Sequence, residues 1–466
     1  MDAASGGQER GDRGNSTRRR LVTLVICVPI VSTFGVACGG GSTQVAAECI
    51  KVVTESGEKT TDCLPVAPDS ERVDLGTPTF SHPTPITNPL HPTSGVEQTI
   101  YGGHVDGKPF RTEVTLLPET KATPYRGATI NTALIQYVAY LDGRLQEVDI
   151  DRYAQADDGS VWYFGEDYSA YEDGKVTDTE GTWVVDDKIP AALIMPAQPR
   201  VGNVYRPENV PEVVFEEVRV DKVDMNIAGP SGNISGAMEV NELHMDGTRE
   251  GKTFAPGYGE FSTGVPGGDL EAVSLASPTD KRADAAPAEF GALSAAARGV
   301  FDAVAASDAE RAKQAATALN QAWEAVLAKG IPPQMESQMK RDIGELTTAI
   351  DVRDWGGAQS AALRIAQNEL DLRLLYHRVI DVDLARMALW ADQLPVDVAA
   401  DDAGAVLGDV AALERTWERT RPGVEQAGAV DTALKELRQA SDAEDLPAVD
   451  RAAATLKQAV TGLHAR

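Results

Sequence analysis

Two residues in the C-terminal half have the types and the spacing of a transition-metal site. His377 and Asp381 are four residues apart in the stretch 369–383, which is rich in charged side chains. On a continuous helix such a pair lies on one face, where imidazole and carboxylate could bind iron or copper. The same stretch contains arginines that would pair with its carboxylates. We therefore favour a salt-bridged seam between helices and keep the metal site as the alternative.

A group of aromatic residues in the N-terminal half could form a binding surface. Trp162, Phe164 and Trp183 lie close together in the sequence, with three tyrosines among them. On one face of a sheet, such rings could line a groove for an apolar or sugar-like ligand. Aromatic side chains also fill the interiors of sheets. We favour the core role and keep the groove as the alternative.

Two further sets of potential metal ligands have simpler explanations. Met335 and Met339 are one helical turn apart, and thioethers bind cuprous copper, but methionines at this spacing are usually core residues. Acidic residues are frequent between 149 and 173 and could supply oxygen ligands to calcium. Because the spacing of an EF-hand loop is absent, we predict solvated acidic turns there.

The cysteines indicate an oxidising compartment. Cys49 and Cys63 flank a short segment with a turn at 55–58, which predicts a hairpin with one cysteine on each arm. A disulfide across this hairpin suits a protein outside the cytoplasm. A pair of metal-bound thiolates is less favoured, because no histidine or further cysteine lies nearby to complete four ligands.

Motifs of common enzyme classes are absent from the sequence. It contains no glycine-rich nucleotide loop, no serine nucleophile elbow and no zinc-protease motif. The glycines at 264–268 precede a linker rather than a helix, so they do not predict a phosphate site. We therefore predict a protein without catalytic activity or cofactor. A hydrolase whose triad is dispersed along the chain is a further alternative.

The first 38 residues carry the features of an export signal. Three arginines at 18–20 precede an uncharged run at 21–37. The end of this run resembles the lipobox of bacterial lipoproteins, which implies cleavage after Ala37 and lipidation of Cys38. Gly35 stands where a lipobox normally has leucine, and an uncleaved signal anchor or twin-arginine export are the alternatives. We predict a lipid anchor in the cell membrane and a protein body on its extracytoplasmic face.

Composition divides the chain into two unlike domains. Only 11 of the 42 glycines follow residue 280, where helix-favouring residues become frequent. This predicts an α+β fold of two separate domains, an antiparallel β meander or half-barrel followed by an all-α domain of four helical hairpins. The expected segments are a signal peptide at 1–37, the lipidated cysteine, disulfide hairpin and proline-rich linker at 38–94, the β domain at 95–275, a linker at 276–288, and the helical-hairpin domain at 289–466.

Turn signals support the β assignment. Asp-Gly pairs, which favour tight hairpin turns, separate runs rich in valine, isoleucine, threonine and tyrosine. These pairs begin at residues 106, 142, 158, 173 and 246. Seven prolines between 65 and 92 predict an extended, solvated linker before the domain.

The helical domain contains a weak repeat. Acidic turns that could cap helices recur, and each precedes an alanine-rich amphipathic run. These turns lie at 307–308, 353–354, 401–402 and 441–442. The resulting hairpins could form two up-and-down bundles or a short solenoid.

Three segments of the β domain, at 153–183, 194–206 and 254–260, share aromatic and glycine motifs with other sequences. Together they resemble an uncharacterised family of secreted bacterial β-domain proteins over about residues 85–265. Phe254 stands where that family often has tyrosine. The resemblance implies a secreted β domain and no particular activity.

The formal net charge of −28 limits the partners of the protein. The negative electrostatic potential of such a chain repels nucleic-acid phosphates and anionic lipid headgroups. The protein would therefore contact the membrane through its lipid anchor. We predict a non-enzymatic, lipid-anchored protein that binds or scaffolds an unknown extracytoplasmic protein or small ligand. The alternative function is a metal-handling accessory lipoprotein whose helical domain holds iron or copper.

Overall fold

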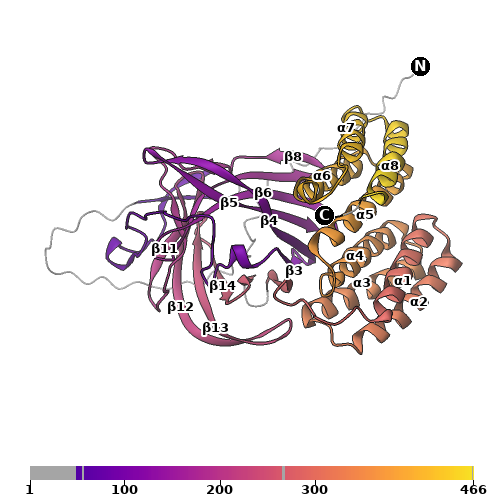
Figure 1. The fold of residues 1–466 in the computed structure, drawn as a ribbon, viewed down its shortest axis with the longest axis horizontal. Coiled ribbons are helices and arrows are strands. Elements are labelled where there is room, and N and C mark those ends of the chain that lie inside the picture. Colours follow the sequence, from indigo (N-terminus) through magenta and orange to yellow (C-terminus); the bar gives the residue numbers. More distant parts are fainter. Residues whose placement is uncertain (1–48, 55–56, 265–267, 464, 466) are drawn as a thin grey trace, which may run out of the picture.

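The computed structural model describes residues 49–54, 57–264, 268–463 and 465. They form a large antiparallel β unit followed by an all-helical unit, which confirms the predicted α+β fold (Figure 1). The predicted signal peptide and Cys38 lie outside the described residues. None of the helices in the described part of the chain combines the length and the apolar character that crossing a bilayer requires.

The β unit consists of a small hairpin and one large sheet. Along the large sheet the strand order is β10-β7-β6-β5-β4-β3-β16-β15-β14-β13-β12-β11, and β8 and β9 also pair with β7. The hairpin strands are β1 (Lys51–Val53) and β2 (Lys59–Cys63). The strands of the large sheet are β3 (Gln98–Val105), β4 (Lys108–Tyr125), β5 (Ala128–Leu141), β6 (Arg144–Gln155), β7 (Val161–Glu172), β8 (Lys175–Asp178), β9 (Trp183–Val184), β10 (Ala192–Met195), β11 (Val204–Val210), β12 (Val214–Gly229), β13 (Gly232–His244), β14 (Arg249–Ala255), β15 (Gly259–Gly264) and β16 (Leu270–Ser277).

Three of the Asp-Gly pairs form the tight turns that the sequence predicts. Asp106, Asp142 and Asp173 have φ angles of 51°, 52° and 48°, and the glycine after each also has a positive φ. Two successive residues in the left-handed region are typical of type I′ turns, whose twist matches that of the strands they connect.

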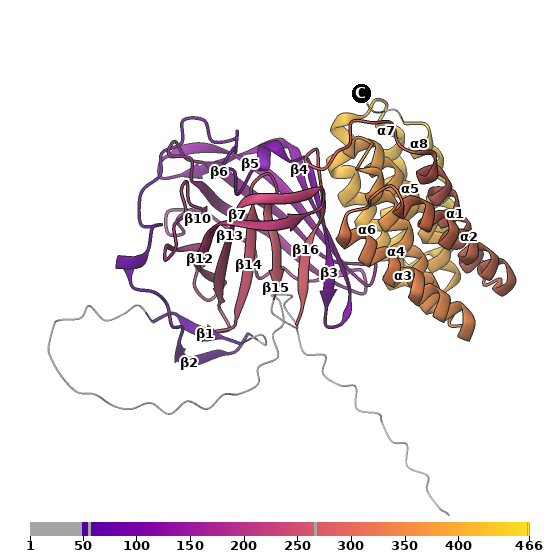
Figure 2. The same ribbon diagram turned by 90° about the horizontal axis from the view of Figure 1, so that it is seen from below.

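The large sheet curves until its two ends, β10 and β11, contact each other. It therefore forms a barrel-like sheet with a concave inner face and a convex outer face, called the half-barrel below because β10 and β11 are not paired as strands (Figure 2). Because successive strand residues point to opposite faces, Tyr101 and Tyr137 lie on the concave face, while Ile100 and Val138 lie on the convex face.

The helical unit consists of two four-helix bundles. Within α1–α4 and within α5–α8, each helix contacts the next, and the first contacts the last (Figure 1). The structure thus decides between the two arrangements that the sequence left open. The helices are α1 (Ala288–Ala305), α2 (Ala309–Leu327), α3 (Pro333–Val352), α4 (Trp355–Arg373), α5 (Val379–Ala399), α6 (Ala403–Thr420), α7 (Gly428–Asp442) and α8 (Leu446–Thr461).

Most of the predicted helix starts are correct. Asp308, Asp354 and Asp402 each accept a hydrogen bond from the backbone N–H three residues later and cap α2, α4 and α6. The start predicted at 441–442 is wrong, because α7 continues through these residues and Asp445 caps α8 instead.

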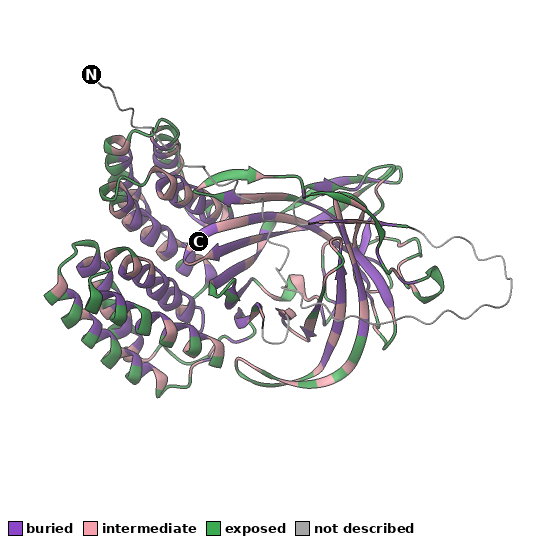
Figure 3. Cartoon of the chain, turned by 180° about the vertical axis from the view of Figure 1, so that it is seen from behind, coloured by how far each residue is buried: buried purple, intermediate pink, exposed green. Residues whose placement is uncertain are grey.

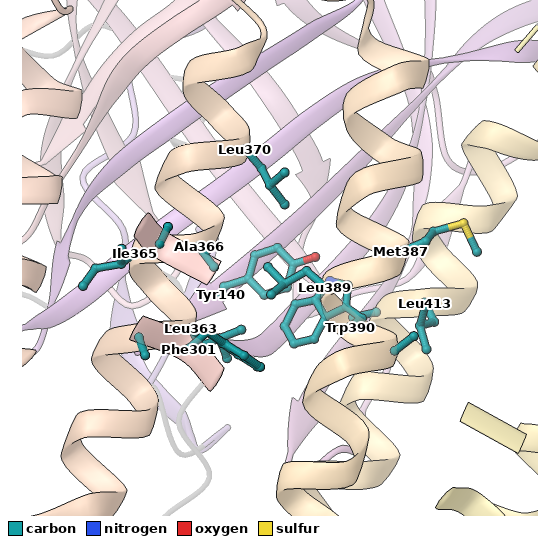
Figure 4. Packing of buried hydrophobic residues seen from close by; sticks show 14 of the residues in the cluster. Tyr140, Phe301, Leu363, Ile365, Ala366, Leu370, Met387, Leu389, Trp390 and Leu413 are labelled. Atoms are coloured by element: carbon teal, nitrogen blue, oxygen red, sulfur yellow. The ribbon is translucent and has the colours of Figure 1, made fainter. Parts of the chain in front are cut away.

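The helical unit covers the convex face of the half-barrel through α3 and α6. Tyr140 of β5 stacks on Trp390 of α5 with ring centroids 5.7 Å apart, within the shared apolar core (Figure 4). Buried residues concentrate where the helices face the sheet and one another (Figure 3). Six buried charged residues, called the interdomain ion network below, also cross this contact. They are Arg111 and Glu113 of β4, Asp371 of α4, Asp383 and Arg386 of α5, and Arg419 of α6.

The second part of the proline-rich segment, from residue 79, is not the solvated linker that the sequence predicts. Residues 79–95, called the strap below, run from the end of β6 to the β14–β15 turn, where backbone hydrogen bonds join them to Gln155 and Gly257. Ile86 and Leu90 of the strap are buried in the core of the half-barrel. The prolines keep the strap extended, and these two apolar side chains hold it against the sheet.

The predicted disulfide is confirmed. Cys49 and Cys63 are bonded, and their Cα atoms are 5.1 Å apart. Apolar residues beside this hairpin pack against Phe215 of β12 and Leu243 of β13. The hairpin therefore lies against the sheet beside β12 and β13.

Candidate functional site

A cavity of about 190 Å³ lies on the concave face beneath the strap. Apolar and aromatic side chains from six strands line most of it, and His91 and Pro92 of the strap close one side. The carboxylates of Asp151, Glu260 and Glu271 also reach this cavity. It therefore combines an apolar wall with acidic groups, which is typical of a small-molecule site.

The acidic lining belongs to a larger set of side chains on the concave face, called the carboxylate band below. Its members interact with one another across β6, β7 and β11–β16. They are Glu147, Asp149, Asp151, Glu166, Glu208, Glu216, Glu242, Glu250, Glu260 and Glu271. Lys252 of β14 lies among them, with its Nζ 3.1 Å from Glu242 and 3.9 Å from Glu260. One ammonium cannot balance ten carboxylates.

Burial changes the protonation of the carboxylate band. Desolvation and neighbouring carboxylates raise the pKa of Glu271 and of Glu166 to about 8, and that of Glu147 to about 7. Desolvation raises the pKa of Asp151 to about 6, and a hydrogen bond of 2.6 Å from the Tyr163 hydroxyl opposes this rise. The band therefore retains protons near neutral pH that a bound cation could replace.

Lys252 organises one part of the band. Burial alone would lower its pKa, but Glu242, Glu260 and Glu216 together raise the pKa of Lys252 well above its usual value. For the carboxylate of Glu216 the effects are reversed. Burial would raise its pKa, but Lys252 and His244 hold that pKa well below its usual range. Near neutral pH this part therefore contains an ammonium and an ionised carboxylate.

The structure separates the predicted metal pair in the helical unit. α4 ends at Arg373 and α5 begins at Val379, so His377 lies in the connecting turn and shares no helix with Asp381. Both residues are exposed, and Asp381 accepts hydrogen bonds of 2.9 and 3.0 Å from Arg378. The assumption of a continuous helix was therefore wrong, and the pair lacks the geometry of a metal site. Met335 and Met339 of α3 are buried in the apolar core.

The aromatic groove, which the sequence left as the alternative to a core role, is not formed by these residues in the cavity beneath the strap. Phe164 is buried against the strap residue Phe80, with centroids 5.4 Å apart, and Trp162 donates a hydrogen bond of 2.8 Å to Ser160. Trp183 is buried against Tyr163. Thus Trp162, Phe164 and Trp183 are buried core residues, and none of them lines the cavity beneath the strap.

The acidic residues between 149 and 173 do not all form solvated turns. Asp149, Asp151 and Glu166 lie on the concave face, in the carboxylate band. Asp157 does lie in a turn, where it accepts a hydrogen bond of 2.7 Å from the backbone of Ser81 and holds the strap. The prediction of solvated turns is therefore wrong for the three inward-facing residues, because the curved sheet encloses the face on which they lie.

A sequence signal for the carboxylate band exists but is ambiguous. Glu147, Asp149 and Asp151 alternate with apolar residues, as Glu242 and His244 do on β13. Such alternation places the acidic residues on one face but is equally typical of a solvent-exposed face. Only the curvature of the sheet and the helices on its other face turn these residues inward.

Comparison of the chain with models of protein families, with curated proteins and with solved structures found no match. The resemblance of residues 85–265 to secreted β-domain proteins therefore stays a prediction.

Proposed function

We propose that this is a non-enzymatic, lipid-anchored binding protein of the extracytoplasmic membrane face, whose half-barrel cavity binds a small organic cation with an apolar part. The observation that carries this proposal is the combination, in one cavity, of an aromatic and aliphatic wall with carboxylates that outnumber the cations beside them.

The chemistry of the cavity favours an ammonium group over a neutral or an acidic one. Asp151 and Glu271 would supply the opposite charge, and the rings of Tyr101, Tyr137 and Tyr153 could contact the cation through their faces. The aliphatic wall would bury the apolar part of the ligand. A cation would replace protons that the buried carboxylates otherwise retain, so its binding would release protons.

Isothermal titration calorimetry of the purified protein tests this function with three probes that differ in charge. They share a phenyl group on a four-carbon chain and differ in the terminal group: 4-phenylbutylammonium is cationic, 4-phenylbutanol is neutral and 4-phenylbutyrate is anionic. We expect the ammonium to bind at least tenfold more tightly than the alcohol, because only the ammonium neutralises a buried carboxylate, and we expect no binding of the anion.

The double variant Asp151→Asn and Glu271→Gln is expected to bind the ammonium at least tenfold more weakly. Glu239→Gln serves as the matched control, because Glu239 pairs with Lys222 at the surface and should leave binding unchanged. Equal affinity for the alcohol and the ammonium would contradict the proposal.

The anchor has a separate test. The Cys38→Ser variant, expressed in a bacterium that processes lipoproteins, is expected to lose the lipid-modified N-terminal peptide in mass spectrometry of the membrane fraction. A wild-type chain without any lipid on Cys38 would contradict the proposed anchor.

A further inference from the structure

Three side chains of the concave face, two of them in the carboxylate band, lie close enough together to bind one ion. Glu216, Glu242 and His244 each offer one ligand atom, and these atoms lie within 4.8 Å of one another. Glu216 and His244 are directly opposed on β12 and β13, and Glu242 lies two residues before His244 on the same face. The sheet register therefore brings two carboxylates and one imidazole together.

Three buried polar atoms of this cluster lack hydrogen bonds within the described part of the chain. Glu242 and His244 are only 1% and 5% exposed. Neither His244 ring nitrogen has a hydrogen-bond partner among the described residues, and neither does Oε1 of Glu242. Such atoms are costly to bury unless an ion or water satisfies them.

The remaining contacts fix which atoms face one another. Nδ1 of His244 lies 3.5 Å from Glu216 Oε1, and Nε2 lies 3.9 Å from Glu250 Oε1. Glu250 in turn accepts a hydrogen bond from Thr263. The second oxygen of Glu242 is 3.1 Å from the Lys252 ammonium, which leaves Oε1 for a different partner.

From this arrangement we infer that Glu216, Glu242 and Nδ1 of His244 bind one divalent transition-metal ion, for which Zn²⁺ is the probe. A mixed set of carboxylate oxygens and an imidazole nitrogen suits a borderline ion of this kind. Glu250, whose Oε1 is 3.9 Å from Nε2, is the carboxylate placed to accept a hydrogen bond from the other ring nitrogen once a bound ion fixes the ring. This site is separate from the organic-cation cavity and does not depend on the function proposed for it.

Charge and access support the same conclusion. Glu208, Glu250 and Glu260 surround the three ligands, so the region stays acidic despite Lys252. A second cavity, of about 70 Å³, lies between the sheet and the disulfide hairpin and is lined by Glu208, Glu216 and His244. An ion could reach the ligands from this side without passing the strap.

Zinc binding by the whole purified chain tests this inference. We expect one Zn²⁺ per chain in competition with a chromophoric chelator, and a higher melting temperature with zinc. His244→Asn and Glu216→Gln should each weaken binding at least 100-fold, whereas Glu250→Gln should weaken it by about 10–100-fold because it acts through the imidazole. The visible spectrum of bound Co²⁺ should disappear in His244→Asn and persist in Glu250→Gln.

The matched control is His377→Ala, which removes an exposed histidine of the helical unit and should leave zinc affinity within twofold of wild type. Melting curves recorded with a chelator show whether each variant is folded. If His244→Asn is unfolded, the zinc affinity of Glu216→Gln provides the test. The inference is overturned if the wild-type chain binds no zinc below 100 µM, or if folded His244→Asn and Glu216→Gln variants bind zinc as wild type does.

Discussion

Replacement of Arg419 by methionine is expected to destabilise the protein by about 3–5 kcal/mol. The Arg419 guanidinium donates two hydrogen bonds of 2.8 Å to Asp383 within the helical unit, and a further one to Glu113 across the contact between the two domains. All three side chains are at most 3% exposed. Methionine would keep most of the volume but leave two carboxylates buried with one cation fewer.

Urea unfolding monitored by tryptophan fluorescence measures this effect, and Arg421→Met is its matched control. Arg421 lies two residues later and pairs with Asp431, but its side chain is 55% exposed. Exposed ion pairs contribute at most about 1 kcal/mol, so this control should change stability little. Similar small effects for both variants would show that the interdomain ion network does not hold the two domains together.

The second large effect is a rise in stability as the pH falls from 8 to 5. The pKa of Glu271 is about 8, that of Glu147 about 7 and that of Asp151 about 6, all above their usual values of about 4 in an unfolded chain. In this window the folded protein retains protons that the unfolded chain releases. The stability from these groups is therefore full below about pH 4 and is lost as the pH rises through the folded pKa values.

Melting temperatures measured from pH 5 to pH 8 with a chelator present test this direction. Each such carboxylate contributes a slope of at most about 1.4 kcal/mol per pH unit, reduced by its residual exposure to water. Glu271→Gln should flatten the profile and raise the melting temperature at pH 8 by several degrees, because an amide carries no charge to desolvate.

The titratable groups that face Glu271 also affect how much this residue changes the stability with pH. They are Glu260, Lys252, Glu147, Tyr101 and Tyr137. Glu239→Gln, at the surface, should leave the profile unchanged. A melting temperature that rises steadily from pH 5 to pH 8 would contradict the prediction.

Local signals in the sequence were sufficient for much of the fold. An Asp-Gly pair sets positive φ angles within two residues, so the turns at Asp106, Asp142 and Asp173 could be predicted. Asp308 and Asp354 cap helices through backbone groups three residues away, which is also a local interaction. The disulfide between Cys49 and Cys63 is also a local feature, because a short hairpin brings its two arms together.

The candidate sites could not be predicted in the same way. His377 and Asp381 were paired on the assumption of a continuous helix, but the chain turns between them to begin the second bundle. In contrast, Glu216 and His244 are 28 residues apart in the sequence and are brought opposite each other by the register of β12 and β13. No local pattern specifies that register.

The sequence by itself determined many of the turns and helix starts, that a β domain precedes a helical one, and that the chain is strongly acidic. Only the tertiary structure decided which face of each strand is enclosed. On β6, Leu145 and Val148 face the helices, whereas Glu147 and Asp149 face the interior of the half-barrel. Side chains alternate between the two faces of a strand with a period of two. The pattern therefore separates the two faces but does not show which of them is enclosed. The curvature of the sheet and the packing of the helices on its convex face decide which face is enclosed, and they thereby place the acidic residues in the interior.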